Sequence, residues 1–214
     1  IRVDAYQNYI WNGFMFSNSD TAFILAQNLL DFGDEQFYAG AKIKAYHLMG
    51  VSNYLKSDYP KALDYYQRSI KINKELGNKK ASASTINNIG IIYKQQGDDS
   101  KALEYYQRSL KIQEEIGNIE GSAISICNIG IIYHDQGDYS KALEYYQRSL
   151  KIEEEIGNPK GSNSTIHNIG IIYKIQGDYP KALKYCKKAL KISQEIRVLI
   201  EEKNACKCLY EIYK

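Results

Sequence analysis

The sequence has 214 residues, 44% of them hydrophobic, and its 28 basic and 25 acidic side chains leave a formal net charge of +3. This composition supports a substantial core and excludes a disordered chain. Without a strongly basic block, nucleic acid is not expected as a partner. No apolar run approaches the roughly 18 residues of a membrane span, so we expect no membrane insertion by this segment.

The N-terminal region carries a degenerate copy of a sequence repeat that recurs later in the chain. The chain begins Ile1-Arg2-Val3-Asp4, with neither an initiator methionine nor a signal-peptide profile. We expect a soluble piece of a longer protein, in either the cytoplasm or the periplasm. Ala22 stands one period of that pattern before Ala62, and the segment 1–38 is therefore predicted to form a degenerate helical hairpin.

Four plain copies of a 40-residue unit follow, and we predict repeats at 39–78, 79–118, 119–158 and 159–197. The hexapeptide NIGIIY occurs at 88–93, 128–133 and 168–173, and SKALEYYQRSLKI occurs at 100–112 and again at 140–152. A fixed period of roughly 20–50 residues is typical of stacked repeats.

Each unit divides into two predicted helices, as the unit at 79–118 illustrates. The first helix has a face with i, i+3, i+4, i+7 spacing, formed by Ile86, Ile89, Gly90 and Tyr93. Gln96-Gly97-Asp98 predicts a turn, because glycine ends a helix in the left-handed conformation and aspartate caps the next. The second helix is expected to begin near residue 99, and Pro60 and Pro180 fit its first turn in other copies.

A glycine recurs in the middle of each first helix, at Gly50, Gly90, Gly130 and Gly170. Because such a glycine costs about 1 kcal/mol relative to alanine, we expect it to permit a close helix crossing. A small residue recurs in each second helix, at Ala62, Ala102, Ala142 and Ala182. We predict that Gly90 faces Ala102 and that Tyr93 and Tyr106 fill the flanks.

The segment 198–214 is predicted to form one more helix, the first of a truncated repeat. Three of its apolar residues stand one repeat period after Ile169, Ile172 and Tyr173, at Leu209, Ile212 and Tyr213.

The four cysteines, Cys127, Cys186, Cys206 and Cys208, follow no zinc-type double pair. On a helix, the thiols of Cys206 and Cys208 would lie about 200° apart. We interpret all four as free thiols. His47 and His167 likewise have no acidic or cysteine partner at ligand spacing, so we expect neither a metal nor a cofactor.

These motifs resemble the tetratricopeptide repeat (TPR) family, whose pattern matches Gly130, Tyr133, Gly137-Asp138-Tyr139, Ala142 and Tyr146. The resemblance implies an all-α fold, an α-α superhelix of about five hairpins plus a C-terminal helix. The period of 40 exceeds the family's usual period of about 34. It is similar to that of kinesin light chains and bacterial signalling TPR arrays, and implies longer helices.

In TPR proteins the first helices line a concave surface, which implies a peptide-binding groove on the arc opposite Gly90. At about 100° per residue, the predicted groove residues are Ser84, Asn87, Asn88, Ile91, Lys94 and Gln95, then Asn128, Ile131, His134 and Asp135, then Ser164, His167, Asn168, Ile171 and Lys174.

A file of asparagines, Asn88, Asn128 and Asn168, recurs along this arc. A carboxamide both donates and accepts, so a row of them can hold the backbone of an extended peptide. An asparagine ladder does this in several TPR families, and the resemblance implies the same here. Alternatively, each asparagine bonds the neighbouring repeat and fixes the stacking angle.

Three other patterns have structural alternatives. Lys94, His134 and Lys174 form a basic rail for acidic side chains or a terminal carboxylate of a peptide, or a solvated helix face. In Tyr105-Tyr106 and Tyr145-Tyr146, one ring belongs to the core and the other shields the next repeat. Lys-Ile-Glu-Glu-Glu at 151–155 is interpreted as a solvated helix end.

The predicted function is a non-enzymatic scaffold that binds a peptide or protein segment, because the sequence contains no phosphate-binding glycine loop, nucleophile elbow or metal-binding helix pair. One alternative is the sensory region of a larger bacterial signalling protein, such as a histidine kinase or nucleotide cyclase. A second alternative is a self-associating array, in which the uncapped C-terminal end stacks on another copy.

Overall fold

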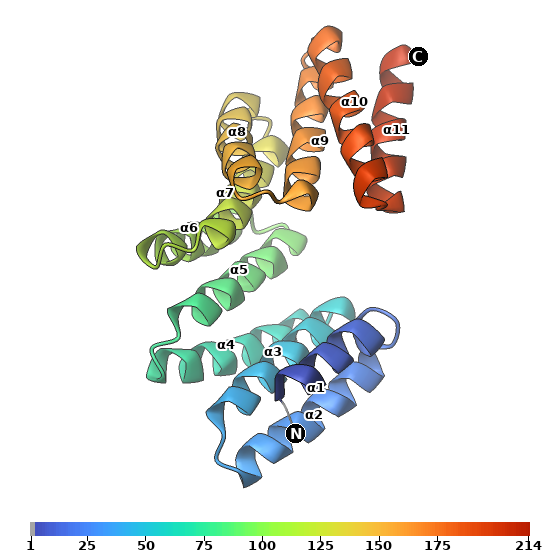
Figure 1. The fold of residues 1–214 in the computed structure, drawn as a ribbon. Helices are drawn as coiled ribbons and strands as arrows, with labels where there is room; N and C mark the ends of the chain where they lie inside the picture. Colours follow the sequence, from blue (N-terminus) through green and yellow to red (C-terminus); the bar gives the residue numbers. More distant parts are fainter. Residues whose placement is uncertain (1–2) are drawn as a thin grey trace. The chain divides into compact units, whose positions relative to one another are not determined.

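The structure is a computed structural model that describes residues 3–214, so Ile1 and Arg2 of the predicted first hairpin lie outside the described residues. The described residues form helices and no strand (Figure 1). In chain order, the elements are α1 (Val3–Ile10), the π-helix η1 (Trp11–Met15), α2 (Ser19–Glu35), α3 (Ala39–Leu55), α4 (Tyr59–Glu75), α5 (Lys79–Gln95), α6 (Asp99–Glu115), α7 (Ile119–Asp135), α8 (Tyr139–Glu155), α9 (Pro159–Ile175), α10 (Tyr179–Ile196) and α11 (Leu199–Tyr213).

The chain forms two compact units, the first extending to Ile112 and the second spanning Gln113–Lys214. In the first unit, α2 packs on α3 and α3 packs on α4. In the second unit, α7 packs on α8, α9 on α10, and α10 on α11. Neighbouring helices in sequence are thus neighbours in space, as expected for helical hairpins.

Left-handed residues separate successive helices at a regular interval, one half of the repeat period. Glycine takes this conformation six times, with φ between 66° and 78°, at Gly77, Gly97, Gly117, Gly137, Gly157 and Gly177. The same register continues at Phe37, Ser57 and Arg197, whose φ values are 50°, 61° and 57°. Because α5 and α6 each contain 17 residues and a short turn joins them, one hairpin occupies one repeat period.

The predicted turn and cap are confirmed at the start of the second helices. Asp138 accepts a hydrogen bond from the backbone N–H of Lys141 at 3.1 Å, and its carboxylate pairs with the Lys141 ammonium at 2.9 Å. The side-chain hydrogen bond from Lys141 lowers the pKa of Asp138. The same ammonium lies over the ring of Tyr133, 5.0 Å from its centre, so one lysine joins the turn to the first helix.

The residue nearest to Gly90 is Tyr106, which corrects the predicted contact with Ala102. A Cβ built at Gly90 would lie 2.6 Å from Cε1 of Tyr106, and one at Gly130 would lie 2.8 Å from the ring of Tyr146. Tyr106 is 1% exposed. The glycine therefore provides space for a buried ring. Ala102 is also fully buried, but it is not among the closest neighbours.

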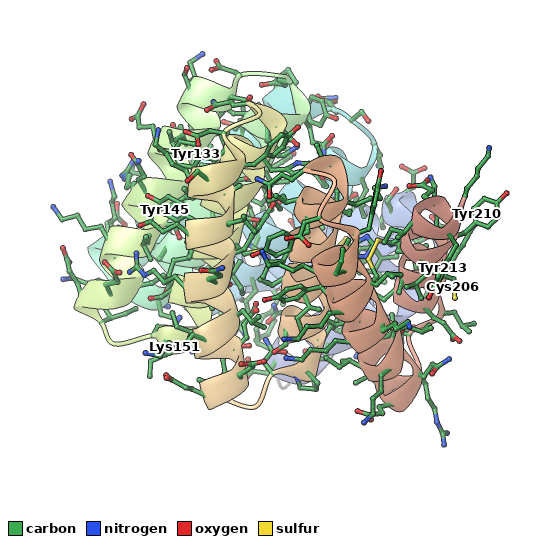
Figure 2. The ribbon with its side chains drawn as sticks, turned by 90° about the horizontal axis from the view of Figure 1, so that it is seen from above. Tyr133, Tyr145, Lys151, Cys206, Tyr210 and Tyr213 are labelled. Atoms are coloured by element: carbon green, nitrogen blue, oxygen red, sulfur yellow. A yellow bond between two sulfur atoms is a disulfide. The ribbon has the colours of Figure 1, made fainter. Side chains whose placement is uncertain are left out.

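The paired tyrosines divide between the core and the hairpin surface. Tyr106 and Tyr146 are each 1% exposed, which confirms that one ring of each pair is a core residue. The other ring stacks within its own hairpin: Tyr145 lies on Tyr133 with ring centres 5.4 Å apart (both residues are labelled in Figure 2).

Cys186 and Cys208 form a disulfide, so the interpretation of these two cysteines as free thiols is wrong. Cys186 occupies the position that Tyr146 holds in the preceding hairpin, where its smaller side chain leaves space for a residue of α11. Its Cα lies 6.3 Å from that of Cys208, and the bond joins α10 to α11 (Figure 2). Cys127 and Cys206 are free.

The end of α8 is only partly solvated, which corrects the interpretation of the segment 151–155. Lys151, Glu154 and Glu155 are exposed, but Glu153 is 4% exposed. Its Oε1 would lie 2.7 Å from a Cβ at Gly161 of the next helix. The equivalent positions in the other repeats are buried and polar as well, at Asn73, Gln113 and Ser193.

Candidate peptide-binding groove

The predicted groove residues lie on α5, α7 and α9, the first helices of three hairpins. Asn88, Asn128 and Asn168 are each half-buried, which leaves part of each side chain accessible. Ile91, Ile131 and Ile171 are half-buried too. Ser84, Gln95, Asp135 and Ser164 are solvent-accessible to different degrees, whereas Asn87 is buried, with 7% exposure.

Side-chain contacts join α7, α9 and α11 in the second unit. Sγ of Cys127 lies 3.6 Å from Oγ1 of Thr165, linking α7 to α9. Nδ2 of Asn163 donates to Oε2 of Glu201 at 2.5 Å, linking α9 to α11. These contacts place α9 between α7 and α11 in the second unit.

Two adjoining cavities open between α9 and α11 and share His167 and Asn204. The first, of about 210 Å³, is lined by Asn163, Ser164, His167, Asn168, Glu201 and Asn204. The second, of about 270 Å³, is lined by His167, Ile171, Lys174, Asn204, Lys207, Cys208 and Glu211. The structure therefore brings together all five groove residues predicted on α9.

Sequence reasoning missed the contribution of α11 to these cavities. Asn204 and Glu211 stand one repeat period after Ser164 and Ile171. The repeat phase that nominated the α9 residues would have nominated these two as well. Glu201 shares the phase of Gly161, which was not a groove residue, so the observed contact with Asn163 was needed to find it.

The smaller cavity contains polar atoms that lack partners. Oδ1 of Asn163, whose side chain is almost fully buried, has no hydrogen-bond partner within the described chain, and the same holds for Nδ1 of His167. Burial lowers the pKa of His167, and the positive charge of Lys174 lowers it further. Because Oδ1 of Asn163 and Nδ1 of His167 are almost fully buried and unpaired within the described chain, each carries a desolvation penalty that a hydrogen bond would relieve.

Two members of the predicted basic rail already have acidic neighbours. The ammonium of Lys174 pairs with the carboxylate of Glu211 on α11, and Nδ1 of His134 lies 3.1 Å from Asp135. A ligand carboxylate would therefore have to compete with these contacts.

The first unit has a larger cavity, of about 420 Å³, between α1, α3, α4 and α5. Of the predicted groove residues only Ser84 lines it, beside Lys44 and His47. Both missed residues share the repeat phase, since Lys44 aligns with Ser84 and His47 aligns with Asn87 of the next copy. Burial lowers the pKa of His47 to about 4, so its imidazole is neutral at physiological pH.

Between Val3 and Lys214 there is no group of three or more His, Cys, Asp or Glu side chains placed to hold a metal ion. Among the helices described, none combines the length and apolar character that crossing a bilayer requires.

Family models identify the repeats. A model described as tetratricopeptide repeat matches residues 42–115, and a second model with the same description matches residues 123–155 and 165–195. This chain belongs to the tetratricopeptide repeat family. Among curated proteins, none matches the sequence.

Solved structures share the TPR fold at low identity. A signal-transduction ATPase with numerous domains from Pyrococcus horikoshii, which has a tetratricopeptide repeat sensor, matches with a TM-score of 0.74 and 19% identity over 99% of this chain and 36% of its own. A Rap protein complexed with competence and sporulation factor gives a TM-score of 0.71 and 15% identity over 100% of this chain and 65% of its own.

A third structure contains nearly identical TPR-like repeats of a putative kinesin light chain from Podosopora anserina. It matches with a TM-score of 0.65 and 13% identity over 91% of this chain and 94% of its own. At such identities the likeness concerns the fold, and it confirms the predicted all-α array of TPR hairpins. Family membership supports a protein-interaction scaffold as the class of function.

Proposed function

We propose that this TPR chain binds an extended peptide or protein segment on the first helices of its hairpins. The observation that carries the proposal is the pair of cavities between α9 and α11, which collect Ser164, His167 and Asn168 around a buried acceptor on Asn163 that has no partner among the described residues. A peptide backbone supplies both N–H donors and C=O acceptors to the carboxamides that line these cavities.

Asparagines on the first helices supply the repeated contact within each unit, Asn88 in the first unit and Asn128 with Asn168 in the second. Asn88, Asn128 and Asn168 recur at one phase of three first helices and are half-buried. Each carboxamide can accept from a backbone N–H and donate to a carbonyl, while the nearby Ile91, Ile131 and Ile171 provide apolar contact. A Rap protein of this fold was solved in complex with competence and sporulation factor, which is consistent with the proposal.

The proposal is tested by selecting peptides from a random library and titrating the best binder by calorimetry. The triple variant Asn88→Ala, Asn128→Ala and Asn168→Ala should bind about 100-fold more weakly, because each lost hydrogen bond contributes about 1 kcal/mol. The matched control is Gln107→Ala with Gln147→Ala, which removes exposed carboxamides from second helices and should leave affinity unchanged.

The stacking alternative gives the opposite result. If the asparagines only fix the angle between repeats, the triple variant loses stability in urea unfolding and keeps its affinity for the peptide. Unchanged affinity in a folded variant would therefore remove the groove assignment.

A second proposed function is the sensory region of a larger signalling protein. The favouring observation is the Pyrococcus horikoshii ATPase with its TPR sensor, because the match with this chain covers only 36% of that protein. The complete open reading frame tests this proposal. It is rejected if the gene encodes no catalytic or membrane segment.

The third proposed function, self-association, rests on α11. Tyr210 and Tyr213 are each 67% exposed on this helix (Figure 2). Sedimentation over a concentration series should show association that Tyr210→Ser with Tyr213→Ser abolishes. A monomer at the highest concentration excludes it.

A further inference from the structure

A cavity of about 440 Å³ lies on the second-helix side of the first unit, away from the asparagine file. It is lined by Gln67, Ile70, Lys71, Lys74 and Glu75 of α4, Ile89 of α5, and Tyr105 and Arg108 of α6. Three cationic side chains thus share a cavity with one carboxylate. Its apolar surface comes from Ile89, which is 2% exposed, with the half-buried Ile70 and Tyr105.

Two hairpin pairs of the second unit place an ion pair at the corresponding positions, whereas Asp34 and Arg68, one period before Lys74 and Arg108, pair with Lys42 and Asp64 instead. In the second unit, Glu114 pairs with Arg148 at 2.5 Å. Glu154 pairs with Lys188 at 2.7 Å. In both cases a carboxylate near the end of one second helix meets a cation on the next second helix, at the same separation in sequence.

In the first unit, one residue of the corresponding pair has the opposite charge. Lys74 stands one repeat period before Glu114, and Arg108 stands one repeat period before Arg148. The carboxylate of the pair is therefore replaced by an ammonium, while the opposing cation is kept. Within the described chain, Lys74 and Arg108 form no ion pair.

Two cations at one cavity repel each other unless an anion lies between them. In the second unit, the carboxylates of Glu114 and Glu154 supply this negative charge, opposite Arg148 and Lys188 respectively. We propose that this cavity binds an acidic segment of a partner protein, with a ligand carboxylate between Lys74 and Arg108 and a neighbouring apolar side chain over Ile70 and Tyr105.

The cavity's composition favours a carboxylate attached to an apolar group over a small inorganic anion. Arg108 can bind a carboxylate through two parallel hydrogen bonds. The accessible apolar surface of Ile70 and Tyr105 would stay uncovered under a bare phosphate. Glu75 adds a negative charge at the wall, which penalises a doubly charged group more than a singly charged one.

The site is independent of the asparagine file. Its residues lie on α4 and α6 apart from Ile89, and Asn88 is not among them. The triple asparagine variant should therefore keep this binding activity, so the two proposals can fail separately.

The test uses the full chain and a fluorescently labelled, blocked peptide, acetyl-Glu-Glu-Leu-Glu-Glu-amide. Fluorescence anisotropy at about 50 mM NaCl should show binding that weakens about 10-fold at about 300 mM NaCl, since exposed charges are screened. The matched peptide with glutamine in place of each glutamate should not bind. Equal binding of the two peptides would overturn the proposal.

Two charge variants test the role of the like-charged pair. Lys74→Glu restores the ion pair of the second unit, so it should reduce peptide affinity at least about 10-fold while the urea midpoint stays equal or rises. Because stability is not lost, weaker binding cannot be attributed to unfolding. An unchanged affinity in this variant would overturn the proposal.

The reverse change should create a second site. Glu154→Lys places two lysines opposite each other in the second unit, and we expect the peptide stoichiometry to rise from one to two. A stoichiometry that stays at one would contradict the role of the like-charged pair.

Competition with inorganic phosphate tests the chemical class of the ligand. Full displacement of the peptide by phosphate at millimolar concentration would show a general anion site and overturn the assignment to an acidic peptide.

Discussion

The ring of Tyr106 occupies the space that a side chain at Gly90 would need. A Cβ at this glycine would lie 2.6 Å from Cε1 of the ring. The same relationship joins Gly130 to Tyr146. The glycine of NIGIIY and the second tyrosine of the SKALEYYQRSLKI segment therefore pack against each other, although they lie on different helices of the repeat.

Gly90→Ala should destabilise the protein by about 1–3 kcal/mol through overpacking, even though alanine improves helix propensity by about 1 kcal/mol. The urea unfolding midpoint measures this effect. Gly13→Ala is the control, because no other group lies within 4 Å of a Cβ built there. Equal stability of Gly90→Ala and the parent would show that the ring moves aside freely.

The disulfide predicts a simple labelling pattern. Under denaturing conditions without reductant, alkylation followed by mass measurement should modify only Cys127 and Cys206. Cys186→Ser should lower stability by about 3 kcal/mol, because the bond closes a loop with a sequence separation of 22. Four alkylated cysteines in the unreduced chain would contradict the pairing.

The buried carboxylate of Glu153 predicts a pH effect of known sign. Burial raises its pKa, so the folded state binds its proton more tightly than the unfolded state does. The destabilisation that Glu153 causes is therefore largest above its folded pKa, and it shrinks as pH falls through that value.

Glu153→Gln should raise stability at pH 7 by about 1 kcal/mol and lose this advantage as the pH falls through the folded pKa of Glu153. The reason is that a carboxamide carries no charge to bury, and Gln113 shows that glutamine fits the equivalent position, where its Oε1 accepts from Nδ2 of Asn118 at 2.6 Å. Thermal unfolding at several pH values measures the difference. Glu155→Gln, at an exposed position, is the control and should show no comparable trend.

The regular spacing of the turn residues made the helix boundaries predictable. Gln96-Gly97-Asp98 was sufficient to place a turn, and α6 begins at Asp99 as expected. This succeeds because left-handed glycine and capping aspartate act locally, within a few residues. The N-terminal region lacks these signals. Only Ala22 indicated a repeat there, and the π-helix at Trp11–Met15 could not be foreseen.

Contacts between helices were harder to predict. The disulfide joins Cys186 to Cys208 on different helices, whereas spacing rules compare cysteines within one segment. Cys186 does share the phase of Tyr146, a core position, so repeat alignment would have indicated that its thiol points inward. The burial of Glu153 was also missed, because it arises from packing against Gly161 of the next helix. The adjacent Glu154 and Glu155 are exposed and gave no sign of it.

The α9 part of the candidate groove followed from helical phase alone, because Ser164, His167 and Asn168 share one face. Repeat phase also marks Asn204 and Glu211 of α11, but phase alone does not show that this helix packs beside α9. Asn204 and Glu211 became part of the site once the packing of α11 beside α9 was known.

The most direct test of the groove is methyl NMR of isoleucine-labelled protein titrated with a selected peptide. Ile91, Ile131 and Ile171 report on the first helices, and Ile72, Ile152 and Ile192 report on the second helices. We expect the largest shift changes at the first three residues. Changes confined to Ile72, Ile152 and Ile192 would contradict peptide binding on the first helices.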